Sequence, residues 1–269
     1  MRNLIDTHCH LYLEEFDQDR EQLIDQAKKS GIELLLLPNV DTTTIEQMHV
    51  VCDQYPEFTY PMMGLHPTSV NPDYKKNLLA IESWLGKRDY CAIGEIGIDL
   101  YWDKTYLKEQ KIVFEEQLAW SIELNLPVAI HTRNAFPEVF ECIHKIGASQ
   151  LKGVFHSFSG TETELSEIKK LGNFKIGING VITFKNSRLD EIIRDADIQD
   201  ILLETDAPYL SPVPYRGKRN EPVYIWETAK KVSDIYKIPV EETVKITKKN
   251  ALNLFKNISN KGELNNMRG

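Results

Sequence analysis

Short apolar runs alternate with longer amphipathic segments along nearly the whole chain. Each run is the length of one strand, ends in polar residues and is followed by a helix-like stretch. Continuous apolar runs of this kind are typical of parallel strands that are buried on both faces of the sheet. The pattern predicts eight strands, at Asn3–Asp6, Glu33–Pro38, Phe58–Leu65, Tyr90–Ile93, Pro127–Ile130, Lys152–Phe155, Phe174–Ile178 and Ile201–Leu203.

The segments between the runs carry helical signals. Phe114, Leu118 and Ile122 recur at spacing four, which places them on one face of a helix. Thr161 and Glu164 have the spacing of a capping box, which opens a helix after the sixth run. Helices are expected at Leu107–Leu124, which contains the first three of these residues, and at Val223–Tyr236 and Val240–Phe255.

Eight strand–helix units in a chain of 269 residues match the size of a (β/α)8 TIM barrel. We expect an α/β fold with a single domain over residues 1–256 and a polar, frayed tail over residues 257–269. The competing architecture is a doubly wound open sheet. No G-x-G-x-x-G motif follows the first run, which weighs against the dinucleotide-binding form of that fold.

Composition narrows the class of protein. Hydrophobic residues make up 42% and charged residues 27% of the chain, as in ordinary globular proteins. The net charge of -8 excludes a broad basic face for nucleic acid, so any such contact must be local. The apolar runs are too short to span a membrane, and Asp6, His8 and His10 break up any secretory signal. We expect a cytoplasmic protein, monomeric by default, with its four cysteines reduced and mostly buried.

Histidines gather at the ends of the expected strands. Of the seven histidines, two fall on expected helices, His49 and His144. The carboxyl ends of barrel strands meet on one face, so side chains placed there converge. Two carboxylates, Glu95 and Asp206, follow the fourth and eighth runs. The histidines at expected strand ends are His8, His10, His66, His131 and His156.

Four of these histidines and the two carboxylates form a mixed nitrogen and oxygen ligand set, which suits zinc, manganese or a similar divalent ion. Six ligands are too many for one catalytic ion that keeps an open position. They are natural for two ions that share a carboxylate. Glu95 is the expected bridge, and a bridge through Asp206 is the competing arrangement. The predicted ligands are His8, His10, Glu95, His131, His156 and Asp206.

The motifs that carry these residues resemble the signature motifs of the TatD family of metal-dependent hydrolases. The matching segments, in the family's order, are Asp6–His10, Gly94–Asp99, His156–Gly160, Glu204–Pro208 and Arg219–Pro222. The resemblance implies an amidohydrolase-like (β/α)8 barrel. It also implies a first ion held by His8, His10, Glu95 and Asp206 and a second held by Glu95, His131 and His156. Thr68 and Leu100 stand where many members have histidine and tyrosine, which leaves substrate preference open.

Each candidate has a less specialised alternative. Asp206 is expected to bind metal and accept a proton from the attacking water, but an aspartate before Ala-Pro also makes a good helix N-cap. Glu204 is expected to orient a ligand histidine, the alternative being a surface carboxylate at a strand end. His66 is expected to contact a substrate phosphate or act as a general acid, the alternative being a hydrogen-bonded loop histidine.

Arginines and aromatic residues near the motifs are candidate substrate contacts. Arg133 and Arg219 are expected to pair with phosphate oxygens, or alternatively with a local carboxylate such as Glu221. Tyr101 is expected to stack on a base, whereas packing beneath the loop is the favoured interpretation for Trp102.

The sequence therefore favours an enzyme that uses two divalent ions (zinc, magnesium or manganese) and a metal-activated water. The resemblance implies a deoxyribonuclease, most often a 3′–5′ exonuclease acting on DNA 3′ ends, with Asp206 and Glu95 at the catalytic centre. The alternative is a D-aminoacyl-tRNA deacylase or another amide or ester hydrolase with the same ligands. A catalytically silent binding scaffold would lack ligands, and none is missing.

Overall fold

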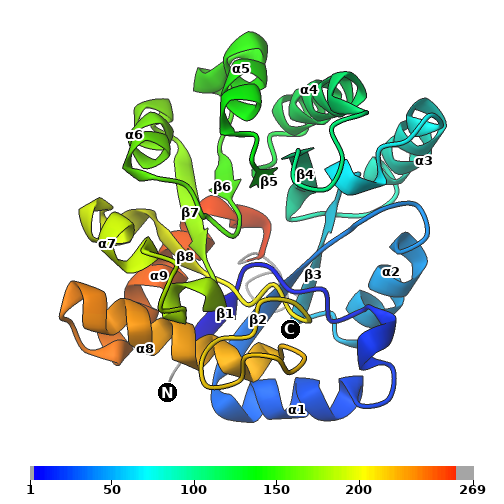
Figure 1. Ribbon diagram of the computed structural model, residues 1–269. Helices are drawn as coiled ribbons and strands as arrows, with labels where there is room; N and C mark the ends of the chain where they lie inside the picture. The colour runs from blue at the N-terminus through cyan, green and yellow to red at the C-terminus, as the bar shows by residue number, and fades with distance from the viewer. Residues whose placement is uncertain (1–2, 259–269) are drawn as a thin grey trace, which may run out of the picture.

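Eight parallel strands form a nearly closed barrel, and their order in the sheet follows their order in the sequence (Figure 1). The computed structural model describes residues 3–258. The predicted (β/α)8 architecture is confirmed, and the open-sheet alternative is wrong. The strands are β1 (Leu4–Asp6), β2 (Ile32–Pro38), β3 (Thr59–Met63), β4 (Ala92–Asp99), β5 (Val128–Arg133), β6 (Gly153–Phe155), β7 (Phe174–Ile178) and β8 (Ile201–Leu203).

Helices surround the barrel on the outside (Figure 1). The expected capping box is present, with Thr161 as the N-cap of α6 and Glu164 bonding back to it. The helix expected from Val223 begins two residues later, because Pro222–Tyr224 forms a 3-10 turn. The helices are α1 (Arg20–Ser30), α2 (Ile45–Gln54), α3 (Tyr74–Leu85), α4 (Leu107–Glu123), α5 (Phe136–Ile146), α6 (Glu162–Leu171), α7 (Leu189–Ile192), α8 (Ile225–Tyr236) and α9 (Val240–Leu254).

Contacts between the first and last strands bring the two ends of the sheet together. The backbone N–H of Thr7 donates to Leu203 O at 3.0 Å, and that of Asp206 donates to His8 O at 2.8 Å. Residues far apart in the sequence therefore meet just beyond β1 and β8. This closure places the H-x-H segment beside Asp206.

Strand β4 is longer than its apolar run predicted. It continues to Asp99 because two glycines interrupt the apolar pattern without ending the pairing with β5. Gly97 lies opposite His131 with φ at 143°, and a Cβ there would approach His131 O to 1.9 Å. Only glycine permits so close an approach of the two backbones. Glu95 consequently projects from within the strand and not from a loop beyond it.

Buried side chains form two layers. A large outer layer packs the strands against the helices, and a smaller layer contains the residues of alternate strand positions that face the barrel interior. Phe255 and Ile258 belong to the inner layer, with Ile258 only 4% exposed. The first two residues of the predicted tail, Asn257 and Ile258, belong to a 3-10 turn at Lys256–Ile258, and Ile258 buries its apolar side chain. Residues 259–269 lie outside the described part of the chain. In the range 3–258, no helix has the length and apolarity needed to cross a bilayer.

Candidate metal centre

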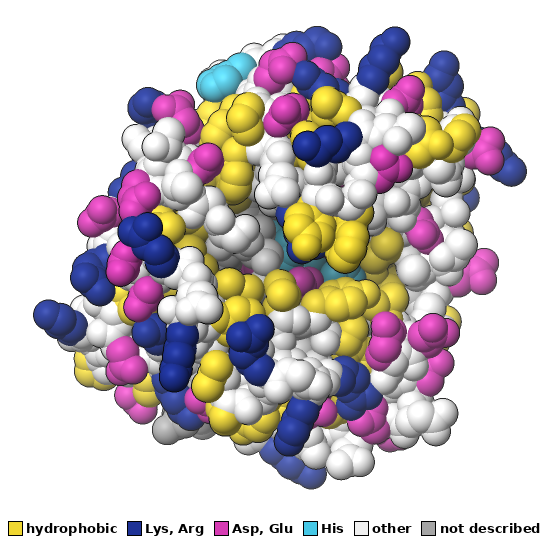
Figure 2. Space-filling view, in the orientation of Figure 1, with side chains coloured by type: hydrophobic (Ala, Val, Ile, Leu, Met, Phe, Trp, Pro, Cys, Tyr) yellow, Lys and Arg dark blue, Asp and Glu magenta, His cyan; other side chains and the backbone are white. Residues whose placement is uncertain are grey.

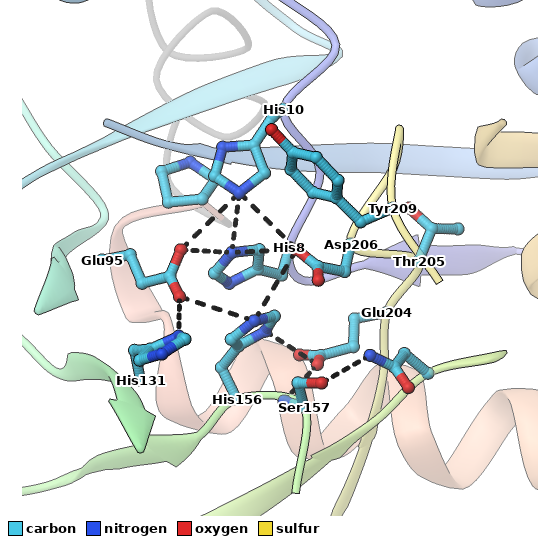
Figure 3. A network of polar contacts seen from close by, with 12 residues as sticks. His8, His10, Glu95, His131, His156, Ser157, Glu204, Thr205, Asp206 and Tyr209 are labelled. Carbon is cyan, nitrogen blue, oxygen red and sulfur yellow. Dashed lines mark hydrogen bonds and ion pairs between the residues drawn. The ribbon is translucent and has the colours of Figure 1, made fainter. Parts of the chain in front are cut away.

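The six predicted ligands converge at the carboxyl end of the barrel (Figure 3). They come from β4, β5 and the segments that follow β1, β6 and β8. All of them except His8 line a cavity of about 590 Å³, visible in Figure 2 as a central hollow with histidine and acidic side chains inside it. No predicted ligand is displaced from the cluster, so the scaffold interpretation has no support.

Glu95 lies at the centre of the cluster, and its two oxygens face different histidines (Figure 3). Glu95 Oε2 lies 3.1 Å from His8 Nε2 and 3.6 Å from His10 Nε2. Glu95 Oε1 lies 2.9 Å from His131 Nδ1 and 3.6 Å from His156 Nε2. One oxygen for each pair of imidazoles is the arrangement that a bridging carboxylate requires.

Asp206 faces the cluster through one oxygen. Its Oδ1 lies 3.6 Å from His10 Nε2, 3.7 Å from His156 Nε2 and 3.8 Å from His8 Nε2. Asp206 has a φ of 59° and sits in a turn, and no helix starts between it and Pro222. The helix N-cap alternative is therefore wrong. The geometry favours a bridge through Glu95 over a bridge through Asp206.

Partners behind the rings decide which nitrogen of each histidine faces the centre. His10 Nδ1 lies 3.0 Å from the hydroxyl of Tyr12, which itself donates to Pro38 O at 2.6 Å. Because the Tyr12 proton is used there, its oxygen accepts the Nδ1 proton of His10. The lone pair of His10 Nε2 is thereby directed inward.

Carboxylates likewise lie against the outer nitrogen of two other imidazole rings, those of His131 and His156. His131 Nε2 lies 2.9 Å from Asp99 Oδ2, which leaves Nδ1 directed at Glu95. His156 Nδ1 lies 2.8 Å from Glu204 Oε1, too bent for a good hydrogen bond but close enough for the carboxylate to favour a proton there. The sequence reasoning overlooked Tyr12 and Asp99. The period of two along β4 would have placed Asp99 on the same face as Glu95.

Glu204 is fully buried, so the alternative of a surface carboxylate is wrong. Its Oε1 accepts the backbone N–H of Ser157 at 2.6 Å. The carboxylate fits because position 177 is glycine, where a Cβ would lie 2.3 Å from Glu204 Oε2. Glu204 thus lies behind His156, where it was expected to orient a ligand histidine.

Electrostatics match the ligand assignment. Burial opposes ionisation of Glu95 and Asp206, yet the surrounding histidines hold the pKa of both carboxyls below the usual value. Burial alone would lower the pKa of His10, but Asp206 and Glu95 outweigh it and raise that pKa to about 9. The pKa of His156 is likewise raised to about 10, against burial, by Glu204, Glu95 and Asp206.

These shifts describe a cluster whose negative carboxylates are neutralised by imidazole protons when no cation is bound. A divalent ion can replace those protons, because the inner nitrogens of His10, His131 and His156 present lone pairs to the centre once they are deprotonated, while the outer partners keep the other ring proton. The donor set therefore fits metal.

The mouth of the cavity carries one guanidinium and exposed aromatic rings. Arg133 lies 3.7 Å above the ring of Tyr101 and 5.4 Å from that of Trp102. Trp102 is 74% exposed and lines the cavity, so its expected packing beneath the loop is wrong. Tyr101, half exposed, supports Arg133. Tyr209, which the sequence reasoning did not single out, also lines the cavity beside His10.

Arg219 does not line the cavity. Its guanidinium makes two bonds with Asp19, at 2.6 and 3.0 Å, and lies 3.4 Å from Glu221. Arg219 therefore pairs with carboxylates, which was the alternative to phosphate binding, and Asp19 is its main partner. His66, by contrast, lines the cavity, and its Nε2 lies 3.3 Å from Glu95 Oε1.

Comparison with known proteins agrees with the fold and with a metal-dependent hydrolase. Residues 5–256 match the family described as TatD related DNase. An uncharacterized metal-dependent hydrolase, YabD of Bacillus subtilis (strain 168), is 35% identical over 254 residues, which cover 94% of this chain and 99% of that protein. The crystal structure of YjjV, a TatD homologue from Escherichia coli K12, superposes with a TM-score of 0.88 at 27% identity and covers 94% and 98% of the two chains. A TatD family hydrolase from Entamoeba histolytica, at 21% identity and a TM-score of 0.80, shares the fold.

Proposed function

We propose that this chain, which belongs to the TatD family of metal-dependent hydrolases, hydrolyses phosphodiester bonds of DNA and works from a 3′ end. One observation carries the proposal. The ligand cluster lies in a cavity that is also lined by Arg133 and by the exposed ring of Trp102, and the Arg133 guanidinium lies 3.7 Å from the ring of Tyr101. A nucleotide has the matching parts, an anionic phosphate beside a flat base.

The six ligand residues would hold two divalent ions, zinc, magnesium or manganese, with Glu95 shared between them. Bound there, the ions would supply an activated water and Lewis-acid stabilisation of the charge that develops on phosphorus oxygens. Asp206 would orient that water and take up its proton, since one oxygen faces the centre and the lowered pKa keeps the carboxyl ionised.

Arg133 supports the choice of a phosphate substrate. Its planar fork can pair with two phosphate oxygens, and its stacking on Tyr101 holds it at the cavity that it lines. Trp102 offers an exposed ring at the same mouth. Stacking of a base on such a ring is tolerant of sequence and adds roughly 1–3 kcal/mol per base.

The test uses metal-stripped protein and single-stranded DNA labelled at either its 3′ or its 5′ end. Magnesium, manganese or zinc is added back, and Asp206→Asn serves as the catalytic control. We expect metal-dependent loss of the 3′ label first, and a loss of rate of roughly a hundredfold or more in Asp206→Asn. Arg133→Ala should raise KM more than it lowers kcat, because it removes binding energy at the mouth.

No cleavage with any metal, at confirmed metal occupancy, would overturn the nuclease proposal. Aminoacyl esters and amides would then be the substrates to assay, since the same ligands can polarise a carbonyl.

A further inference from the structure

The geometry points to a role for His66 that differs from that of the other cluster histidines. Thr68 fixes the tautomer of His66, so that its ring does not bind the second ion. Instead, the ring donates a hydrogen bond to a phosphoryl oxygen of the substrate. The identity of the acceptor rests on the proposed function. The tautomer and the absence of metal ligation do not.

Distance alone would make His66 a ligand. Its Nε2 lies 3.3 Å from Glu95 Oε1, and its ring centroid lies 4.5 Å from that of His131. Together with Glu95 and His131 it forms a group whose ligand atoms could surround one ion. The question is which nitrogen of the ring carries the proton.

Thr68 answers that question. Its backbone N–H donates to His66 Nδ1 at 3.2 Å, and its hydroxyl lies 2.6 Å from the same nitrogen. A backbone N–H can only donate, so Nδ1 must present its lone pair. A neutral imidazole has one lone pair and one N–H, and His66 Nε2 therefore carries the proton. A protonated nitrogen cannot bind a metal.

Three of the other rings are held the opposite way. For His10, His131 and His156, the nitrogen that faces away from the centre lies against an acceptor: the Tyr12 oxygen, Asp99 and Glu204 respectively. These partners keep the proton outside and direct a lone pair inward. At His66 the outer partner is a donor, so the ring presents N–H inward instead.

The local sequence explains this difference. His66 is the N-cap of a 3-10 turn at Pro67–Ser69, and its side chain accepts the first available backbone donor of that turn. Proline has no N–H, so the donor is Thr68. The His66-Pro67-Thr68 segment thus sets the tautomer through its own backbone.

The inward N–H of His66 points into the cavity that Arg133 also lines. Without substrate it faces Glu95 Oε1. A phosphoryl oxygen bound beside Glu95 would lie within reach of the same N–H, so His66 would add a neutral donor to the charge supplied by Arg133.

The metal content of two variants tests the claim that His66 does not bind metal. Zinc-loaded His66→Ala should keep the metal stoichiometry of the unmodified protein, whereas His131→Ala should lose metal. In protein labelled with 15N-histidine, the ring nitrogen shifts of His66 should show protonated Nε2 both without metal and with zinc. Thr68→Val, which keeps the backbone N–H, should leave that tautomer unchanged. Loss of zinc from His66→Ala, or loss of the Nε2 proton on zinc loading, would overturn the inference.

Binding of inorganic phosphate tests the donor role of His66 without requiring catalytic activity. Calorimetry on the zinc-loaded protein should show roughly ten- to hundredfold weaker phosphate binding in His66→Ala, the range expected for losing one hydrogen bond to a charged acceptor. His66→Gln, which retains an N–H donor, should recover most of that loss. Equal phosphate affinity in all three proteins would overturn the donor role. Failure of DNA cleavage would instead overturn the proposed function, and the zinc and 15N results would still stand.

Discussion

At the scale of the residue, the cluster is specified as much by the groups behind the imidazoles as by the imidazoles themselves. Tyr12, Asp99 and Glu204 each take the outer nitrogen of one ring. These partners fix the ring orientation before any ion arrives. Ligand geometry that is set in advance lowers the cost of binding, and loss of such a partner typically weakens metal affinity ten- to a hundredfold.

The assignment of two ions predicts the effect of removing one ligand. His131→Ala should reduce bound metal from two ions toward one per chain, because His131 serves only the second ion. Elemental analysis of the purified, zinc-saturated protein measures this directly. His144→Ala, which changes an exposed histidine of α5, is the matched control and should retain full occupancy. Unchanged stoichiometry in His131→Ala would refute the two-ion arrangement.

A glycine far from any ligand in the sequence should also control metal affinity. Gly177→Ala would place a Cβ 2.3 Å from Glu204 Oε2, so the carboxylate must move and His156 loses its partner. We expect zinc affinity to fall by roughly tenfold or more, measured by competition with a chelator. Gly86→Ala is the control, since a Cβ there meets nothing within 4 Å. Equal affinity in both variants would show that Glu204 has no influence on the metal.

At the scale of the element, the segment between β8 and α8 forms one wall of the site. It carries Asp206 and Tyr209, and Asn220 Nδ2 donates to Thr205 O at 2.8 Å and to Tyr209 O at 2.6 Å. Arg219 joins this segment to the segment before α1 through Asp19. The wall is therefore held by bonds within the segment, by the backbone bond from Asp206 to His8 and by contacts with other loops, among them the Arg219–Asp19 ion pair.

The two interpretations of Arg219 predict different results for Arg219→Ala. As a link to Asp19 it should contribute about 1 kcal/mol, because both side chains are partly exposed and solvent screens the pair. The midpoint of thermal unfolding should then fall by roughly 2–4 °C, with KM for DNA nearly unchanged. Asp19→Asn should give a similar loss. A large increase in KM with no loss of thermal stability would restore the phosphate-binding role.

At the scale of the whole molecule, an acidic chain concentrates carboxylates at the centre of its barrel. Glu95, Asp206, Asp99 and Glu204 are all buried there. Among the described residues, protonated histidines supply the compensating charge when no cation is bound, as the raised pKa values of His10 and His156 indicate. Bound metal would take over that role.

This exchange predicts how metal and pH together affect stability. Raised folded-state pKa values stabilise the metal-free protein below about pH 6.5, and that contribution is lost as the pH rises toward 9 for His10 and 10 for His156. Metal binding must displace the same protons, so metal affinity should increase with pH, by about tenfold per pH unit for each proton released. As the pH rises, the metal-free protein therefore loses stability while metal binding becomes stronger.

The rise in unfolding temperature caused by manganese or zinc should therefore be larger at pH 8 than at pH 6. Thermal unfolding with and without a chelator at the two pH values measures it, and the same scans on His131→Ala should show a smaller difference. An equal or larger rise at pH 6 would contradict the proton displacement.

The sequence by itself determined the barrel and the convergence of its candidate ligands, because both depend on local patterns. Apolar runs of strand length and amphipathic segments report burial directly, and parallel strands bring their carboxyl ends to one face whatever the details of packing. His8, His10, His131 and His156 could therefore be placed together from their positions alone. The extent of β4 could not, because it depends on how closely Gly97 approaches the backbone of β5.

Only the tertiary structure decided what each remaining side chain faces. Arg219 meets Asp19, two hundred residues away, and Trp102 lies at the mouth of the cavity and not beneath its loop. Such pairings depend on the three-dimensional positions of single atoms, which hydrophobic periodicity and motif spacing do not encode.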